Sequence, residues 1–304
     1  MIPYRLKIGD TIGIVSPSDP IPHERKEYLE NSIRYLQEFD FEVKAAKNAL
    51  KKSLTPKEKG EDINEMFSDT DVKAVLCSYG GNTAEQCLDY IDWKNVEKNP
   101  KIFIGFSDNT VPINAIHKKT GLVTFHGPDL ISGFGEPSDY FVDEFCNRLV
   151  KGKIGKIPQN KERKCVRPGI AEGELVGGNV RCLLKLADTE YWPDMKDSIL
   201  FLESYTATPQ KSEKYFNRLM NLDVFDKING AAIGYVYGLQ ATEERLKLEQ
   251  MEKTLDRITK DYNFPILKVN DFGHFTPNTV LPVGTKARID ADKEEIEILE
   301  RCVK

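Results

Sequence analysis

Short apolar runs alternate with amphipathic stretches in the first half of the chain. The apolar runs cover residues 11–15, 73–77, 101–104 and 122–125, and each is followed by a turn-forming cluster or a polar segment. Residues 23–39 instead place apolar side chains at helical spacing, with charges on the other face. This alternation predicts a mostly parallel sheet with helices on both faces. The polar turns after the strands should then meet at one edge of the sheet, where such folds bind ligands.

The second half has a different pattern. Apolar runs at 199–202 and 230–236 predict further strands, and residues 243–258 read as one helix. Residues 286–290 and 295–299 alternate with period two, which predicts an antiparallel hairpin with one wet face. We therefore expect an α/β protein in which a smaller, barrel-like α+β domain follows the parallel one.

The length of 304 residues also favours two domains, since a single domain averages about 150 residues. We expect an N-terminal domain over 1–150, a linker over 151–172 and a C-terminal domain over 173–304. The linker carries seven bases and two acids, with interspersed Gly and Pro. It reads either as a solvated connection between domains or as a basic lip that attracts an anionic substrate.

The composition argues against several classes of protein. Hydrophobic residues make up 40% and charged residues 30%, and the net charge is −5, which argues against a disordered chain and against a nucleic-acid binder. No apolar run approaches the roughly 18 residues of a membrane span, and the first residues do not resemble a secretory signal. The six cysteines form no C-x-x-C pair and accompany no histidine cluster, so we expect reduced thiols, a cytoplasmic location and no metal site.

Ser107 is the first candidate for chemistry. It lies in Gly-Phe-Ser-Asp-Asn, between an apolar strand and a predicted helix start. A tight turn there would expose the hydroxyl oxygen, and the N–H groups that follow would lie at the positive end of a helix. The alternative is a serine that only caps the helix.

A nucleophilic serine needs a base and a group that orients the base. Among the four histidines, His274 lies in a loop between Gly and Phe and can point into a cleft, whereas His23 and His117 fall on surface helices and His126 follows a strand. Glu203 ends an apolar strand, where a carboxylate is costly to bury unless it is paired. The alternative is a strand-end glutamate that reaches water.

Two pairs of glycines could expose backbone N–H groups at the sheet edge where a ligand is expected. Gly80 and Gly81 follow a strand and could direct N–H groups at a substrate, or could form a plain turn. Gly177, Gly178 and Asn179 have a similar pattern, which is also that of a simple helix cap.

The ordered set of these motifs resembles the LD-carboxypeptidase family of serine peptidases, which includes muropeptide carboxypeptidases and microcin C immunity peptidases. The resemblance covers nearly the whole chain and rests on Tyr79-Gly80-Gly81, Ile104-Gly105-Phe106-Ser107-Asp108, Phe125-His126-Gly127-Pro128, Gly177-Gly178-Asn179, Ile199-Leu200-Phe201-Leu202-Glu203 and Gly273-His274.

The resemblance implies a triad of Ser107, His274 and Glu203 in a cleft between the domains. The N–H of Asp108 and one from Gly80 or Gly81 would stabilise the oxyanion. It further implies a small peptide substrate, no metal or organic cofactor, and a homodimer. The net charge and the lack of a long apolar run separately argue against a nucleic-acid or membrane partner. The leading hypothesis is a carboxypeptidase that removes a D-amino acid from a cell-wall peptide. The alternatives are an immunity-type peptidase acting on a peptidyl-nucleotide amide and a non-catalytic binding protein that uses the cleft.

Two departures from the family bear on the substrate. Residues 151–172 contain no aromatic side chain, whereas the immunity branch carries an aromatic there that would stack on a nucleobase. Ser78 and Tyr79 also stand where many muropeptide enzymes have a basic residue before the two glycines. The group that would bind a substrate's terminal carboxylate is therefore missing from that position.

Overall fold

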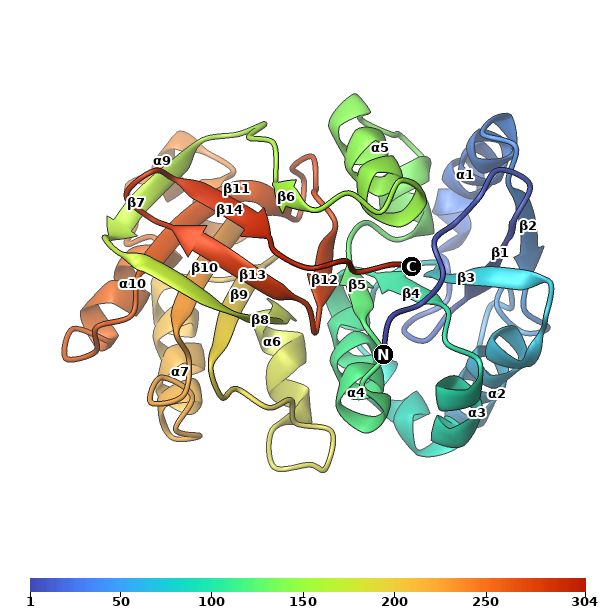
Figure 1. Ribbon diagram of the computed structural model, residues 1–304, viewed down its shortest axis with the longest axis horizontal. Helices are drawn as coiled ribbons and strands as arrows, with labels where there is room; N and C mark the ends of the chain where they lie inside the picture. Colours follow the sequence, from blue (N-terminus) through green and yellow to red (C-terminus); the bar gives the residue numbers. More distant parts are fainter.

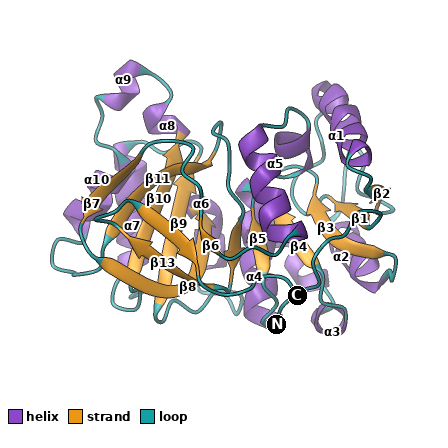
Figure 2. Ribbon diagram, turned by 45° about the horizontal axis from the view of Figure 1, so that its top comes forward, coloured by secondary structure: helices purple, strands orange, loops and turns teal.

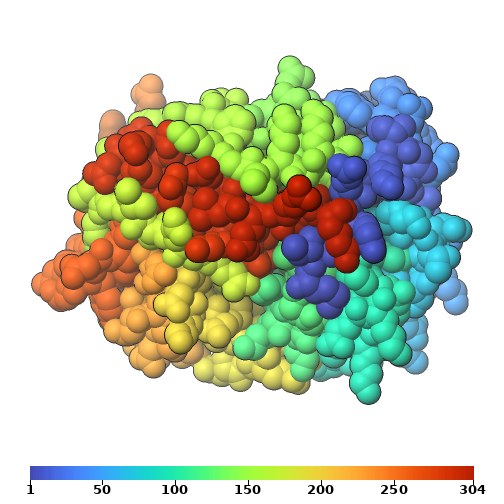
Figure 3. All heavy atoms as spheres, in the orientation of Figure 1, coloured from blue at the N-terminus to red at the C-terminus, as the bar shows by residue number.

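The computed structural model describes all 304 residues and contains two sheets side by side (Figure 1). The six-stranded sheet has the order β12-β5-β4-β3-β1-β2, and the eight-stranded sheet has the order β6-β14-β13-β8-β9-β10-β11-β7. The N-terminal and C-terminal segments lie next to each other on one face of the molecule (Figure 3). No helix is long and apolar enough to cross a membrane.

The first sheet is mostly parallel, as the alternating pattern predicts. Its strands are β1 (Thr11–Val15), β2 (Glu42–Ala45), β3 (Val72–Cys77), β4 (Ile102–Gly105), β5 (Thr124–His126) and β12 (Leu281–Val283). Only β12 is antiparallel, to β5. Successive residues of a strand face opposite sides, so Val75 packs with α2 and α4, and Leu76 packs with α1 and α5.

The second sheet combines a parallel centre with antiparallel margins. Its strands are β6 (Gly155–Lys156), β7 (Arg163–Arg167), β8 (Ile170–Asn179), β9 (Ser198–Ser204), β10 (Gly230–Val236), β11 (Ile266–Gly273), β13 (Lys286–Asp290) and β14 (Glu295–Ile298). Strands β8 to β11 are parallel, and the expected hairpin is the antiparallel pair β13–β14. The barrel-like expectation is wrong in detail, because the sheet stays open between its edge strands β6 and β7.

The helices cover the sheets, and in one place they differ from the prediction. They are α1 (Lys26–Glu38), α2 (Pro56–Ser68), α3 (Trp93–Lys98), α4 (Thr110–Thr120), α5 (Asp139–Phe145), α6 (Val180–Leu183), α7 (Pro209–Met220), α8 (Tyr237–Gln240), α9 (Glu243–Leu246) and α10 (Met251–Ile258). The single helix expected over 243–258 is two helices. Figure 2 shows α8 and α9 projecting from the end of the second sheet.

The segment expected to be a linker contributes structure to the second sheet. Residues 155–156 and 163–167 form its two edge strands. Arg163 is buried against Asp271, and Arg167 pairs with Asp256. None of the seven bases lines the cavity described below, so the structure does not support the basic lip.

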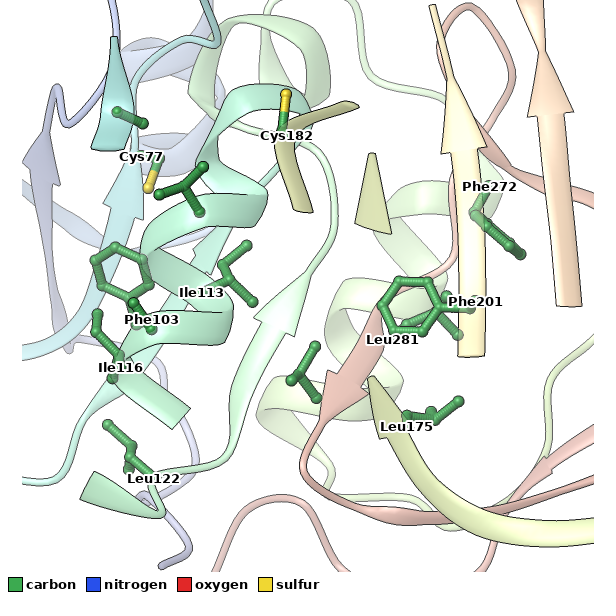
Figure 4. Close-up of a cluster of buried hydrophobic side chains, with 14 of the residues drawn as sticks. Cys77, Phe103, Ile113, Ile116, Leu122, Leu175, Cys182, Phe201, Phe272 and Leu281 are labelled. Atoms are coloured by element: carbon green, nitrogen blue, oxygen red, sulfur yellow. The ribbon is translucent and has the colours of Figure 1, made fainter. Parts of the chain in front are cut away.

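One hydrophobic cluster joins the two sheets. It includes Phe103 and Ile113 from the first sheet and its helix α4, and Leu175, Phe201 and Phe272 from the second sheet (Figure 4). Strand β12 also adds residues from the C-terminal part of the chain to the first sheet. Because the two halves share buried apolar surface, they hold the facing strand ends in a fixed relation.

Candidate active site

Ser107 lies at the strained turn between β4 and α4. Its φ of 59° is in the left-handed region, which non-glycine residues seldom adopt. Residues 107–109 form a short 3₁₀ turn that leads directly into the helix. The turn therefore presents the hydroxyl oxygen at the carboxyl edge of the sheet. Ser107 caps neither the turn nor the helix, whose N-cap residues are Phe106 and Asn109, and its Oγ is paired with His274.

Gly80 approaches Ser107 so closely that a side chain would not fit easily. A Cβ added to Gly80 would lie 3.1 Å from the Cβ of Ser107 and 3.2 Å from its Oγ. The backbone N–H groups of Gly80 and Gly81 donate to no acceptor in the protein, and both residues line the cavity. Free N–H groups beside a nucleophile have the arrangement of an oxyanion hole.

Glu203 is completely buried at the end of β9, and both of its oxygens are paired. Oε1 accepts a hydrogen bond from Nδ2 of Asn179 (2.8 Å), and Oε2 lies 2.7 Å from Nδ1 of His274. Burial raises the pKa of Glu203, but the positive charge that His274 carries when it is protonated, together with its hydrogen bond, outweighs burial and leaves the pKa below its ordinary value. The carboxylate is therefore ionised and does not reach water.

His274 connects the other two residues. Its Nε2 lies 3.0 Å from Oγ of Ser107, on the opposite side of the ring from Glu203. An ionised carboxylate can only accept, so Nδ1 carries the proton and Nε2 is free to accept one from the serine. Gly273 sets this position: its φ is +132°, and a Cβ there would collide with the carbonyl oxygen of Tyr235.

The three side chains meet at a cavity of about 840 Å³ between the two halves of the molecule. Ser107 comes from the first half, and Glu203 and His274 come from the second. Two exposed aromatic rings stand near the base: the ring centroid of Tyr205 lies 5.1 Å from that of His274, and the ring centroid of Phe275 lies 5.9 Å from that of Tyr205. This arrangement can remove a proton from a serine and stabilise the charge that follows.

Asp108 has a role that its motif does not reveal. Its carboxylate is buried and accepts hydrogen bonds from Ser18 (2.6 Å), the N–H of Ala84 (2.9 Å) and Nζ of Lys185 (2.7 Å). Burial raises its pKa, but these bonds, Lys185 first, outweigh burial and hold the pKa below its ordinary value. Asp108 is not among the residues that line the cavity, so its side chain fixes the turn behind Ser107.

The remaining histidines do not take part in the triad. His23 is exposed, and His117 pairs with Glu174. His126, which follows a strand, does not reach the cavity, because it is buried between the rings of Phe106 and Phe201. The sequence also left Asn179 undecided: it both caps α6 through its Oδ1 and donates to Glu203.

Two family models match this chain. Residues 12–127 match the LD-carboxypeptidase N-terminal domain, and residues 172–289 match the LD-carboxypeptidase C-terminal domain. The chain belongs to the LD-carboxypeptidase family. The resemblance seen in the motifs is thereby confirmed, and the protein is a peptidase by family.

Relatives in the family span the chain from end to end. It is 30% identical to the microcin C7 self-immunity protein MccF of Escherichia coli, over 97% of this chain and 95% of that one. It is 32% identical to a probable murein peptide carboxypeptidase of Bacillus subtilis, over 99% and 95%. The structure of MccF in complex with aspartyl sulfamoyl adenosine superposes with a TM-score of 0.92 at 27% identity, covering 100% of both chains.

Proposed function

We propose that the protein is a serine carboxypeptidase that hydrolyses the amide bond to the C-terminal amino acid, a D-amino acid, of a small cell-wall peptide. The observation that carries this proposal is the chain of hydrogen bonds from Glu203 through His274 to Ser107, beside free N–H groups. The similarity to the murein peptide carboxypeptidase supports the substrate class. Membership of a peptidase family argues against the non-catalytic binding protein.

In the proposed mechanism, His274 takes the proton of Ser107 while Oγ attacks the scissile carbonyl carbon. Glu203 stabilises the imidazolium that forms and holds its tautomer. The N–H groups of Gly80 and Gly81 stabilise the tetrahedral oxyanion, each worth about 3 kcal/mol in sites of this kind. The N–H of Asp108 is the third candidate donor. His274 then protonates the leaving amine, and water hydrolyses the acyl-enzyme.

A second candidate is an immunity-type peptidase that cleaves a peptidyl-nucleotide amide. The exposed aromatic rings at the cavity favour it, because Tyr205 and Phe275 are 44% and 71% exposed and could stack on a base. They offer a stacking surface that residues 151–172 lack. The similarity to MccF, whose structures hold sulfamoyl nucleosides, supports the same candidate.

A peptide panel separates these candidates. Wild type and Ser107→Ala are incubated with tetrapeptides that end in D-Ala or L-Ala and with an aminoacyl sulfamoyl adenosine, and products are identified by mass spectrometry. We expect release of D-Ala only, and a loss of at least about 10⁴-fold in Ser107→Ala. Cleavage of the nucleoside alone would favour the second candidate, and full turnover by Ser107→Ala would remove Ser107 from the mechanism. A cytoplasmic location and a homodimer remain part of the proposal.

A further inference from the structure

Arg181 brings a positive charge to the catalytic cavity that nothing in the protein neutralises. It belongs to α6, two residues after Asn179, and lines the cavity. Its side chain forms one hydrogen bond, from Nη2 to Oδ1 of Asn82 (2.6 Å), and no ion pair. A guanidinium has five N–H donors, so most of them remain available for a ligand.

Lys185, four residues further along the chain, is a cation with a purely structural role and gives a comparison for Arg181. Lys185 pairs with Glu85 and Asp108, each at 2.7 Å, and also donates to the carbonyl oxygen of Asn82. Its charge is therefore fully compensated, and it does not line the cavity. Because Lys185 already ties Asn82 to the second half of the molecule, the unpaired charge of Arg181 is not needed for that task.

Arg181 is bonded to the segment that lines the cavity beside the nucleophile. Asn82 directly follows Gly80 and Gly81, whose N–H groups have no acceptor in the protein, and Gly80 lies against Ser107. Asp19 lies against Gly81 and would repel a second carboxylate there. An anionic substrate group in this part of the cavity thus requires a cation. Of the two cations bonded to Asn82, Arg181 lines the cavity and has no ion pair, whereas Lys185 is already paired.

We infer that Arg181 binds the anionic end of the substrate's leaving group, which is the terminal carboxylate if the substrate is a peptide. The inference rests on the proposed function. Arginine suits this task because its planar fork can hold both oxygens of a carboxylate. Arg181 would also replace the basic residue that many muropeptide enzymes have at the position of Ser78 and Tyr79. In this chain the positive charge would come from the second half of the molecule. A nucleotide phosphate offers the same chemistry from a different substrate.

The test compares a peptide that ends in free D-Ala with the same peptide ending in D-Ala amide. In Arg181→Gln we expect kcat/KM for the free acid to fall about 10- to 100-fold, mainly through KM, and kcat/KM for the amide to stay unchanged. Arg181→Lys should keep part of the preference. The matched control is Arg25→Gln, which removes the other cavity arginine, held over the ring of Tyr28 at 4.8 Å. It should leave the preference intact.

Binding measured in the Ser107→Ala background gives the answer independently of turnover. We expect tighter binding of the acid than of the amide, and loss of that difference when Arg181→Gln is added. Equal losses for acid and amide, or a preference that survives Arg181→Gln, would overturn the inference. Adenosine monophosphate is the third ligand: if only its binding depends on Arg181, the peptide assignment is wrong. Failure of wild type to release D-Ala would instead refute the proposed function.

Discussion

His126 is a buried histidine whose two ring nitrogens have no hydrogen-bond partner. It lies among Phe106, Phe201 and Phe272, directly behind the triad. Burial lowers its pKa from 6.5 to about 4, because the charged ring is not solvated there. The fold therefore holds a neutral imidazole next to Glu203, and protonation of that imidazole opposes folding.

The shift predicts an acid-dependent loss of stability. The folded-state pKa lies below the unfolded one, so the unfolded chain binds more protons and stability falls as pH drops from 6.5 to 4. The loss is about 3 kcal/mol, at about 1.4 kcal/mol per pKa unit. We expect His126→Leu to abolish this part of the loss. Urea unfolding of both proteins at pH 7 and pH 4 measures it.

A paired comparison is needed because Asp129 acts in the opposite direction. Burial raises the pKa of Asp129 to about 6, so its contribution to stability increases as pH falls from 6 to 4. Both proteins contain Asp129, so its effect cancels in the difference between them. Equal losses in wild type and His126→Leu would show that the His126 imidazole does not titrate in this way.

At the scale of elements, the helix break between α9 and α10 shows where the sequence pattern stops being informative. Apolar spacing continues through residues 243–258, yet the amide of Gln250 donates to the carbonyl oxygens of Arg245, Leu246 and Leu248. These bonds satisfy carbonyls that a continuous helix would have used. Periodicity reports which face is apolar, and it does not report such competition by one side chain.

The sequence likewise predicts some residues of the candidate site and not others. Ser107, Glu203 and His274 stand in local motifs at strand ends, so the sequence could single them out. The bonds of Arg181 and Lys185 to Asn82 join segments 99 and 103 residues apart and leave no local pattern. The parallel first sheet followed from hydrophobic periodicity, but the parallel centre of the second did not, since its short apolar runs fit several strand directions.

The β11 strand sets the position of the base through Gly273. A substitution Gly273→Ala places a methyl group against the carbonyl oxygen of Tyr235 at a φ that alanine avoids. We expect a loss of at least about 2 kcal/mol in stability, and of about 10²-fold or more in kcat as His274 moves away from Ser107. Steady-state kinetics and urea unfolding check both. Normal kcat would mean that the base does not depend on this strand end.

The ion pair between Lys185, which follows α6, and Asp108 in the Ser107 turn provides a second test at this scale. Lys185→Met leaves the buried carboxylate of Asp108 without its cation, and we expect a loss of about 3 kcal/mol in unfolding free energy. The control is Lys119→Met, which removes a more exposed pair with Glu190 and should cost less than about 1 kcal/mol. Similar costs for the two variants would contradict a special role for the Asp108 network.

At the scale of the whole molecule, we expect the shared core to make the two halves one cooperative unit. The chain has two tryptophans: Trp93 belongs to the first half, and Trp192 to the second. Both pack against the cluster that joins the sheets, and Trp93 touches Tyr191 across the boundary, with ring centroids 5.6 Å apart. A site assembled from both halves requires that the two halves keep a fixed position relative to each other.

Cooperativity can be measured with one tryptophan at a time. In Trp192→Phe the fluorescence reports the first half, and in Trp93→Phe it reports the second. We expect the fluorescence transition of each variant in urea to coincide with its own far-ultraviolet circular dichroism transition. A tryptophan signal that changes at a clearly different urea concentration would mean that the halves unfold separately, and that their relation is not fixed by the common core.

The most direct test of the account is chemical labelling of the serine. A fluorophosphonate reacts with a hydroxyl only when a neighbouring base activates it. We predict a single adduct, mapped by peptide mass spectrometry to Ser107, that forms in wild type and is lost in His274→Ala and strongly slowed in Glu203→Gln. Labelling at another residue, or equal labelling of wild type and His274→Ala, would contradict a hydroxyl activated by side chains from the opposite half of the molecule.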